Sequence, residues 1–173
     1  MVINNNKHYN FGIIFLLSFT GLIIFLVQNQ VNAQEMPPRP VAVSLIQNLS
    51  FGGLTQGLTT GTITITAPGM RYATGSVILV GLGILYYPAI CGLQGNPGTI
   101  MHPYGPDATL TGSNGGSITF HFHDSSPTDP IIINVAPPGT MQVRVGGTLD
   151  IGYPAANPPG HYTGSFQVMF IQE

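Results

Sequence analysis

The chain has 173 residues, of which only 6% are charged, and its formal net charge is −2. Four Lys and Arg residues are too few for a nucleic-acid-binding protein, which must neutralise many phosphates, and one Cys excludes a disulfide-rich scaffold. With 23 Gly, 15 Pro and 43% hydrophobic residues, the composition also excludes long helices and intrinsic disorder. We therefore expect a β-rich chain interrupted by many turns.

The first 33 residues have the pattern of a secretory signal peptide. The uncharged apolar run 11–27 follows Lys7, and Val31 and Ala33 occupy the −3 and −1 positions of a cleavage site. We expect cleavage after Ala33 and export to the periplasm, the cell surface or the extracellular medium. The alternative is a retained anchor, because 17 apolar residues are at the short limit for a bilayer-spanning helix. No second such run follows, so we expect no membrane span after cleavage.

The rest of the chain divides into a Pro-rich extended lead-in, residues 34–40, and a β domain, residues 41–173. Alternating apolar runs bounded by Gly, Pro and Asn recur along the domain, and no segment has helical periodicity. The expected strands are 41–46, 49–51, 62–66, 76–81, 89–93, 117–122, 131–135, 141–145, 148–151 and 162–171. The runs 76–81 and 131–135 are continuously apolar, which predicts strands buried on both faces. Many short strands favour a sandwich or a barrel.

The expected closing strand has one face that belongs in the core. By alternation, the positions on this face are Tyr162, Gly164, Phe166, Val168 and Phe170. A Gly within a strand indicates a bulge or a close backbone approach, and a Tyr after a turn fits a tyrosine corner. Emptying a buried Phe site costs roughly 3–5 kcal/mol, which we expect for Phe166→Ala.

The opposite face of the closing strand becomes apolar at its end, at Met169 and Ile171. This predicts cover on both sides of the last residues, by a loop, by the strand from Val41 or by another subunit.

Three motifs of the domain have the sequences NLSFG at 48–52, VGGTLDI at 145–151 and PGHYTGSFQV at 159–168. The positions that define them are Leu49, Phe51, Gly52, Gly147, Gly160, Tyr162, Gly164, Phe166 and Val168. In this order and spacing the motifs resemble the DUF4402 family of secreted bacterial proteins. The closing motif is also similar to that of spore coat protein U and of chaperone–usher pilin-like domains.

The resemblance covers roughly residues 41–171 and implies an immunoglobulin-like antiparallel β-sandwich of about nine strands. It also implies export from a Gram-negative cell and no known enzymatic activity. Pilin-like relatives are fibre subunits that are completed by a strand donated from a neighbour. The chain departs from that pattern at Cys91, where many pilins have a Cys pair, and at residues 34–40, which are short and Pro-rich.

His121 and His123 are the strongest chemical signal in the sequence. Two His at i and i+2 of a strand point the same way and can bind Zn²⁺ or Cu²⁺, as in a cupin motif. The carboxylate spacing of that motif is missing, however. If Phe120 and Phe122 face the core, both His side chains face solvent. We therefore expect no metal and no cofactor.

No other residue set indicates catalysis. Cys91 alternates with Ala89 and Leu93, so we expect a small buried hydrophobic residue rather than a nucleophile. The chain has no G-x-S-x-G motif, and its Gly-rich segments precede no helix that could bind phosphate. The acids Asp107, Asp124 and Asp129 lie in turn-rich segments, where Asp is favoured for turn formation. We expect that the protein is not an enzyme.

We therefore expect an exported structural or adhesive protein at the cell surface, as a fibre or matrix subunit. Its partners would be like subunits or other cell-surface proteins, bound through a strand edge. One alternative is a glycan-binding module that uses exposed aromatic rings, although the chain lacks Trp; the candidates are Tyr86, Tyr87, Tyr104 and Tyr153. Two others are a small outer-membrane β-barrel, favoured by alternation and low charge, and a metal-binding cupin-like enzyme, favoured by His121 and His123 alone.

The signal peptide can be tested by the mass of the exported protein. We expect an intact mass that begins at Gln34, because the small residue Ala33 completes the cleavage site. A mass that retains residues 11–27 would show that the apolar segment is an anchor.

Overall fold

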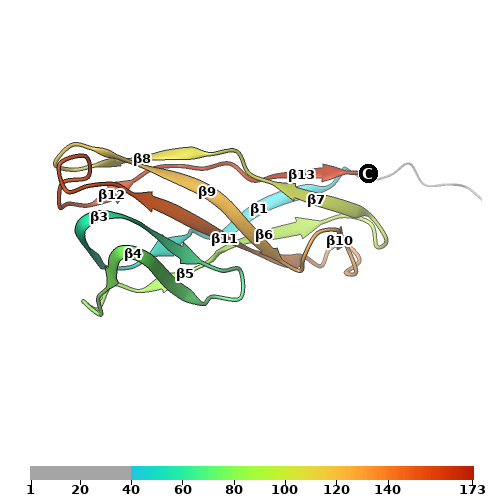
Figure 1. Cartoon of the computed structure of the whole chain (residues 1–173). Coiled ribbons are helices and arrows are strands. Elements are labelled where there is room, and N and C mark those ends of the chain that lie inside the picture. Colours follow the sequence, from blue (N-terminus) through green and yellow to red (C-terminus); the bar gives the residue numbers. More distant parts are fainter. Residues whose placement is uncertain (1–39) are drawn as a thin grey trace, which may run out of the picture. The chain divides into compact units, whose positions relative to one another are not determined.

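The computed structural model describes residues 40–173, and every regular element within this range is a β-strand (Figure 1). The predicted signal peptide and residues 34–39 of the predicted lead-in lie outside the described residues. The strands are β1 (Ala42–Gln47), β2 (Ser50–Phe51), β3 (Leu54–Ile65), β4 (Arg71–Leu79), β5 (Tyr86–Tyr87), β6 (Ala89–Gln94), β7 (Ile100–Tyr104), β8 (Ala108–Gly112), β9 (Ser117–Ser126), β10 (Ile131–Ile132), β11 (Met141–Ile151), β12 (Tyr162–Thr163) and β13 (Met169–Gln172). Within this range there is no helix that is long and apolar enough to cross a membrane. The prediction of an all-β fold is confirmed.

The larger sheet has eight antiparallel strands arranged around β11. Its order is β1-β6-β11-β9-β8-β12, and β3 and β4 extend it from β11. β11 pairs with β6 through residues 141–145 and with β3 through residues 147–151, while β9 pairs along residues 144–150. β6 and β3 therefore lie end to end along one edge of β11, and β9 lies along the other. The smaller sheets are β10-β7-β13 and β2-β5.

The end of the chain runs antiparallel to β8 and β7 as one interrupted strand. Tyr162 pairs with Gly112 of β8, and Met169 pairs with Tyr104 of β7. The predicted single strand 162–171 is wrong in its middle, because residues 164–168 belong to no strand of the described chain. The partner is interrupted as well, at residues 105–107 between β7 and β8, where Pro106 has no backbone N–H to donate.

Two strands that were predicted to be buried on both faces are partly exposed. β4 pairs only with β3, and at this edge the side chain of Ile78 is 61% exposed. In the run 131–135, Ile131 and Ile133 are buried but Ile132 is exposed, so one face of β10 meets solvent. The thirteen strands of the described chain also exceed the nine expected, because β5, β7 and β8 lie in segments for which no strand was predicted. An apolar run shows a preference for extended structure but does not show which faces are covered.

Two apolar clusters form the core and meet at the closing segment. In the first, Met101 and Ile131 of the β10-β7-β13 sheet pack with Leu93 and Val143 of the larger sheet. In the second, side chains of β3, β4, β9 and β11 surround the fully buried ring of Phe120. The members of the second cluster are Ile63, Val77, Ile118, Phe120, Leu149 and Ile151. Phe166 packs against both clusters.

The contact between Phe120 and Phe166 depends on a glycine in β11. The two rings lie with centroids 4.5 Å apart. Behind them, a Cβ atom at Gly147 would overlap the Phe120 ring. Gly147 is therefore required by close packing, which explains its place in the VGGTLDI motif.

We expect Phe166→Ala to destabilise the domain by about 2–3 kcal/mol. This is less than the cost for a fully buried Phe, because Phe166 is only half-buried. Gln167→Ala is the matched control: it removes an exposed side chain from the next position and should change stability by less than about 0.5 kcal/mol. Urea unfolding measures both, and equal midpoints for the two variants would show that Phe166 does not support the core.

Candidate binding cleft

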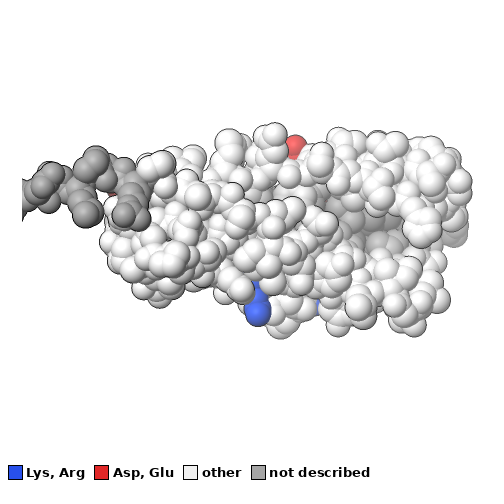
Figure 2. Space-filling model, turned by 180° about the vertical axis from the view of Figure 1, so that it is seen from behind, with Lys and Arg blue, Asp and Glu red and all other residues white. Residues whose placement is uncertain are grey.

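An open cleft lies between the first and the last strands of the domain. β1 pairs only with β6, and the closing segment pairs only with β8 and β7, so each has an edge without a partner strand among the described residues. The space between these edges has a volume of about 1120 Å³. In Figure 1 the layers with β8 and β12 above and β3 to β5 below separate at the left, and Figure 2 shows the surface hollowed at the corresponding end, on its right.

The floor of the cleft is the hydrophobic core itself. The buried residues Ile118, Phe120, Leu149 and Ile151 line it. Among the described residues, no Asp, Glu, Lys or Arg contributes to its surface. The cleft therefore suits an uncharged and largely apolar occupant.

The two walls combine apolar side chains with open backbone edges. On one wall, Val43 and Leu45 of β1 line the cleft, and Leu45 is 63% exposed. On the other wall, Phe166 and Val168 project from the segment 164–168, which lies outside the strands. An edge strand presents unpaired N–H and C=O groups that can pair with another strand. This geometry can bind an extended peptide by adding it to a sheet edge.

The three sequence motifs, although far apart in the chain, meet at this cleft. The VGGTLDI motif contributes Leu149 and Ile151 to its floor. The defining residues of the other two motifs that line it are Leu49, Phe51, Gly52, Gly160, Tyr162, Gly164, Phe166 and Val168. Gly147 lies behind Phe120 and not on the cleft surface. The Tyr162 hydroxyl donates a hydrogen bond of 2.7 Å to the carbonyl oxygen of Pro158, four residues upstream. This is the tyrosine-corner contact expected from the sequence, and it fixes the turn at one end of the cleft.

Gly164 allows the closing segment to approach β8. An ideal Cβ at this position would lie 2.6 Å from the carbonyl oxygen of Thr109. The expected close backbone approach is therefore present, and it holds one wall of the cleft against β8.

Cys91 also lines the cleft and is buried, as expected for a small hydrophobic residue. Burial raises the pKa of its thiol. The described residues that line the cleft include no second thiol and no Asp or Glu, and His161 contributes an imidazole.

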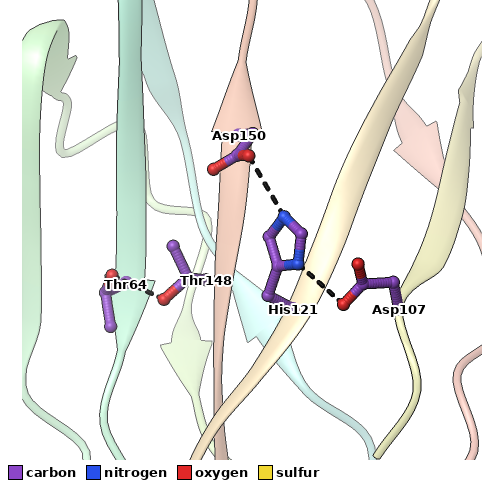
Figure 3. Close-up of polar contacts among 5 residues, drawn as sticks. All are labelled: Thr64, Asp107, His121, Thr148 and Asp150. Atoms are coloured by element: carbon purple, nitrogen blue, oxygen red, sulfur yellow. Dashed lines mark hydrogen bonds and ion pairs between the residues drawn. The ribbon is translucent and has the colours of Figure 1, made fainter.

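His121 and His123, the two histidines singled out in the sequence, do not line the cleft. His121 Nδ1 is 2.7 Å from Asp107 Oδ1, and His121 Nε2 is 3.1 Å from Asp150 Oδ2 (Figure 3). His123 has a different neighbour, with its Nε2 3.5 Å from the Tyr72 hydroxyl. The two His side chains therefore do not share a ligand site, and residues 40–173 contain no group of three His, Cys, Asp or Glu placed to hold a metal ion.

His121 instead links three parts of the sheet. It lies on β9, Asp150 lies on β11 and Asp107 precedes β8. The hydrogen bond with Asp107 is the main cause that raises the pKa of His121, and the bond with Asp150 acts in the same direction. Sequence reasoning assigned Asp107 to a turn and did not select Asp150. Asp150 pairs with Thr119 of β9, two residues before His121, so its side chain lies near that of His121. This proximity depends on the register between β11 and β9, which the sequence alone does not give.

Other polar residues have structural partners. Asp124 accepts a hydrogen bond of 2.8 Å from the backbone N–H of Ala67. Asp129 Oδ1 lies 2.7 Å from His102 Nδ1. Both acids thus connect separate segments, which goes beyond the turn role that the sequence suggested.

The four tyrosines considered for glycan binding are exposed, but they come from different elements. Two are the residues of β5, one ends β7 and one follows β11; they are Tyr86, Tyr87, Tyr104 and Tyr153. The guanidinium carbon of Arg71 lies 5.1 Å from the ring centroid of Tyr86, so a cation already occupies one face of that ring.

Comparison with protein families found a match to the family described as "Domain of unknown function (DUF4402)" over residues 41–171. No curated protein and no solved structure matched the chain.

The link through His121 predicts a measurable titration. Because its folded-state pKa is raised above the ordinary value of 6.5, the stability it contributes is complete below that value and is lost as the pH rises through the raised pKa. We expect an NMR titration midpoint for His121 above 6.5. Asp107→Asn should lower the midpoint more than Asp150→Asn, and Asp129→Asn, which affects His102, should leave it unchanged. A midpoint at or below 6.5 in the unmodified protein would contradict the assignment.

Proposed function

This chain belongs to the DUF4402 family, and we propose its function on the basis of the cleft between its first and last strands. We infer an exported, non-enzymatic subunit of a fibre or matrix at the cell surface, with a structural or adhesive role. Its immunoglobulin-like sandwich lacks a final strand, and a strand from a neighbouring molecule fills the gap. The observation that carries the proposal is an apolar cleft bounded by two open strand edges over the core.

A β-strand matches this cleft better than a compact ligand. Its backbone can hydrogen-bond to β1 on one side and to residues 164–168 on the other. Its alternate side chains can cover the core residues on the floor, and buried apolar surface contributes about 25 cal/mol per Å². A lipid chain could cover the floor but has no groups to pair with the two backbone edges.

The chemistry of the cleft supports a role in binding rather than catalysis. Burial raises the pKa of the Cys91 thiol and so keeps it protonated, which disfavours a nucleophilic role. The expected signal peptide and the low charge agree with an exported protein that acts through contacts.

Self-assembly can be followed through Cys91, because it is the one Cys of the chain and lies in the cleft. We expect the purified protein to form larger species as its concentration rises, in sedimentation measurements. Because Cys91 is buried and the pKa of its thiol is raised, a maleimide should label the dilute monomer slowly, and the assembled fraction more slowly still, since an added strand covers the cleft. Protein denatured in urea provides the control for full labelling. A protein that stays monomeric, with a labelling rate independent of concentration, would contradict the proposal.

A further inference from the structure

The loop between β4 and β5, residues 80–85, exposes several large apolar side chains. Leu82, Ile84 and Leu85 are 72%, 50% and 74% exposed. Residues 77–93, which include this loop, contain no charged side chain and no Ser, Thr, Asn or Gln. An exposed apolar patch of this kind commonly marks contact with another protein or with a membrane.

The loop is fixed at both ends and turns between them. Leu79 pairs with Leu54 of β3. Tyr86 pairs with Phe51 of β2. The backbone bends at residues 82–83, and Gly83 has a φ of 73°, in the left-handed region that favours glycine. Nothing in the described chain lies within 4 Å of an ideal Cβ at Gly83, so this part of the loop is open to solvent.

The exposed side chains project on more than one side of the loop. Ile84 and Leu85 are adjacent, and adjacent side chains outside helices point in different directions, yet both are exposed. A strand in the cleft could cover Leu82 and Ile84, which line its rim, but Leu85 is not part of the cleft lining. A single protein surface covers one side of such a loop, whereas the fluid hydrocarbon of a lipid bilayer surrounds all of its side chains.

The residues beside the loop match the interface of a bilayer. Tyr86 and Tyr87 follow the loop directly and are exposed. Tyr is enriched at this interface, because its ring is apolar and its hydroxyl is polar. The guanidinium carbon of Arg71 lies 5.1 Å from the ring centroid of Tyr86, so a positive charge stands near the end of the loop. Residues 40–106 contain no Asp or Glu, so β2 to β5 present no negative charge to phosphate headgroups.

The backbone of the loop limits how deeply it can enter a bilayer. In hydrocarbon, each N–H or C=O group without a partner is costly. The hydrogen bonds that the loop makes to the rest of the described chain lie at its ends, from the Val80 N–H to the Gly53 carbonyl and from the Ser50 hydroxyl to the Leu85 carbonyl. The middle of the loop therefore needs water or headgroups around its backbone. Its side chains can still reach the boundary between headgroups and acyl chains.

We propose that residues 80–85 insert their apolar side chains into the interface of a phospholipid bilayer and attach the domain to that surface. This inference goes beyond the proposed function and does not depend on strand addition at the cleft. The side chains of Leu82, Ile84 and Leu85 together have about the apolar size of one myristoyl chain, which binds membranes reversibly with a constant on the order of 10⁴ M⁻¹. We expect a binding constant of this order.

The first test is sedimentation of the exported protein with vesicles of phosphatidylcholine and phosphatidylglycerol. The variant Leu82→Ser/Leu85→Ser should bind at least about tenfold more weakly, because it removes most of the inserted apolar surface. The matched control is Ile132→Ser/Ile171→Ser, which changes two exposed residues of the β10-β7-β13 sheet that do not line the cleft. It should bind like the unmodified protein. All proteins share one N-terminus, and we expect similar unfolding midpoints because the changed side chains are exposed.

A fluorescent reporter tests the site itself. The chain has no Trp, so one introduced Trp reports one position. In Leu85→Trp, vesicles should shift the emission to shorter wavelength, and a spin label near the headgroups should quench it more than one at the end of the acyl chain. Ile132→Trp, on β10 at the other end of the domain from β4 and β5 (Figure 1), should show neither effect.

Three results would overturn the inference. They are the absence of vesicle binding by the unmodified protein, equal binding by the Leu82→Ser/Leu85→Ser variant, and a Leu85→Trp emission that responds to protein concentration but not to lipid. The last result would identify the loop as a protein contact instead. None of them bears on strand addition at the cleft, which is followed separately through Cys91.

Discussion

The close packing of Phe120 on Gly147 determines how the rest of the domain is arranged. Because no side chain projects from Gly147, the Phe120 ring can lie against β11 and still present a surface to Phe166. β11 pairs with three other strands, β6, β3 and β9. The Phe120 ring is therefore fixed against the strand that connects these three. The closing segment is held by its contact with this ring and by its pairs with β8 and β7. The same contact makes Phe120 part of the cleft floor.

Local sequence patterns predicted the strands and the apolar faces but not which faces would be covered. The alternation of Tyr162, Phe166 and Val168 predicted that they share one face in the core, and in the structure these half-buried side chains line the cleft. The break at residues 164–168 was not predictable from that segment, because alternation shows which side chains share a face and not where pairing with a neighbouring strand stops. The family assignment needed three motifs together, and the structure shows why: most of their residues surround one cleft.

The polar residues show the same limit of local reasoning. Spacing alone placed His121 and His123 on one face and suggested a shared ligand, yet His121 lies between Asp107 and Asp150, and His123 lies near Tyr72. Asp107 precedes β8, Asp150 lies on β11 and Tyr72 lies on β4. Which of these residues contacts each histidine therefore depends on the order of the strands in the sheet and not on distance along the sequence. The bridge at His121 is surface-exposed, and exposed ion pairs contribute little to stability. The His121 bridge joins neighbouring strands and lies outside the cleft. Titration of His121 therefore affects the sheet at this bridge and not the apolar floor of the cleft.

The surface of the domain is difficult to reconcile with an isolated molecule in water. Natural proteins protect edge strands with charges, especially Lys, or with Pro. Residues 42–47 of β1 contain neither. The core is open between β1 and the closing segment, and Leu82 and Ile84 are exposed at the rim of the opening. In a monomer these features favour nonspecific aggregation, whereas a strand added at the cleft by another molecule would cover the apolar floor and give the two unpaired backbone edges a partner. The low charge of the chain then becomes understandable, because charges at either surface would oppose that contact.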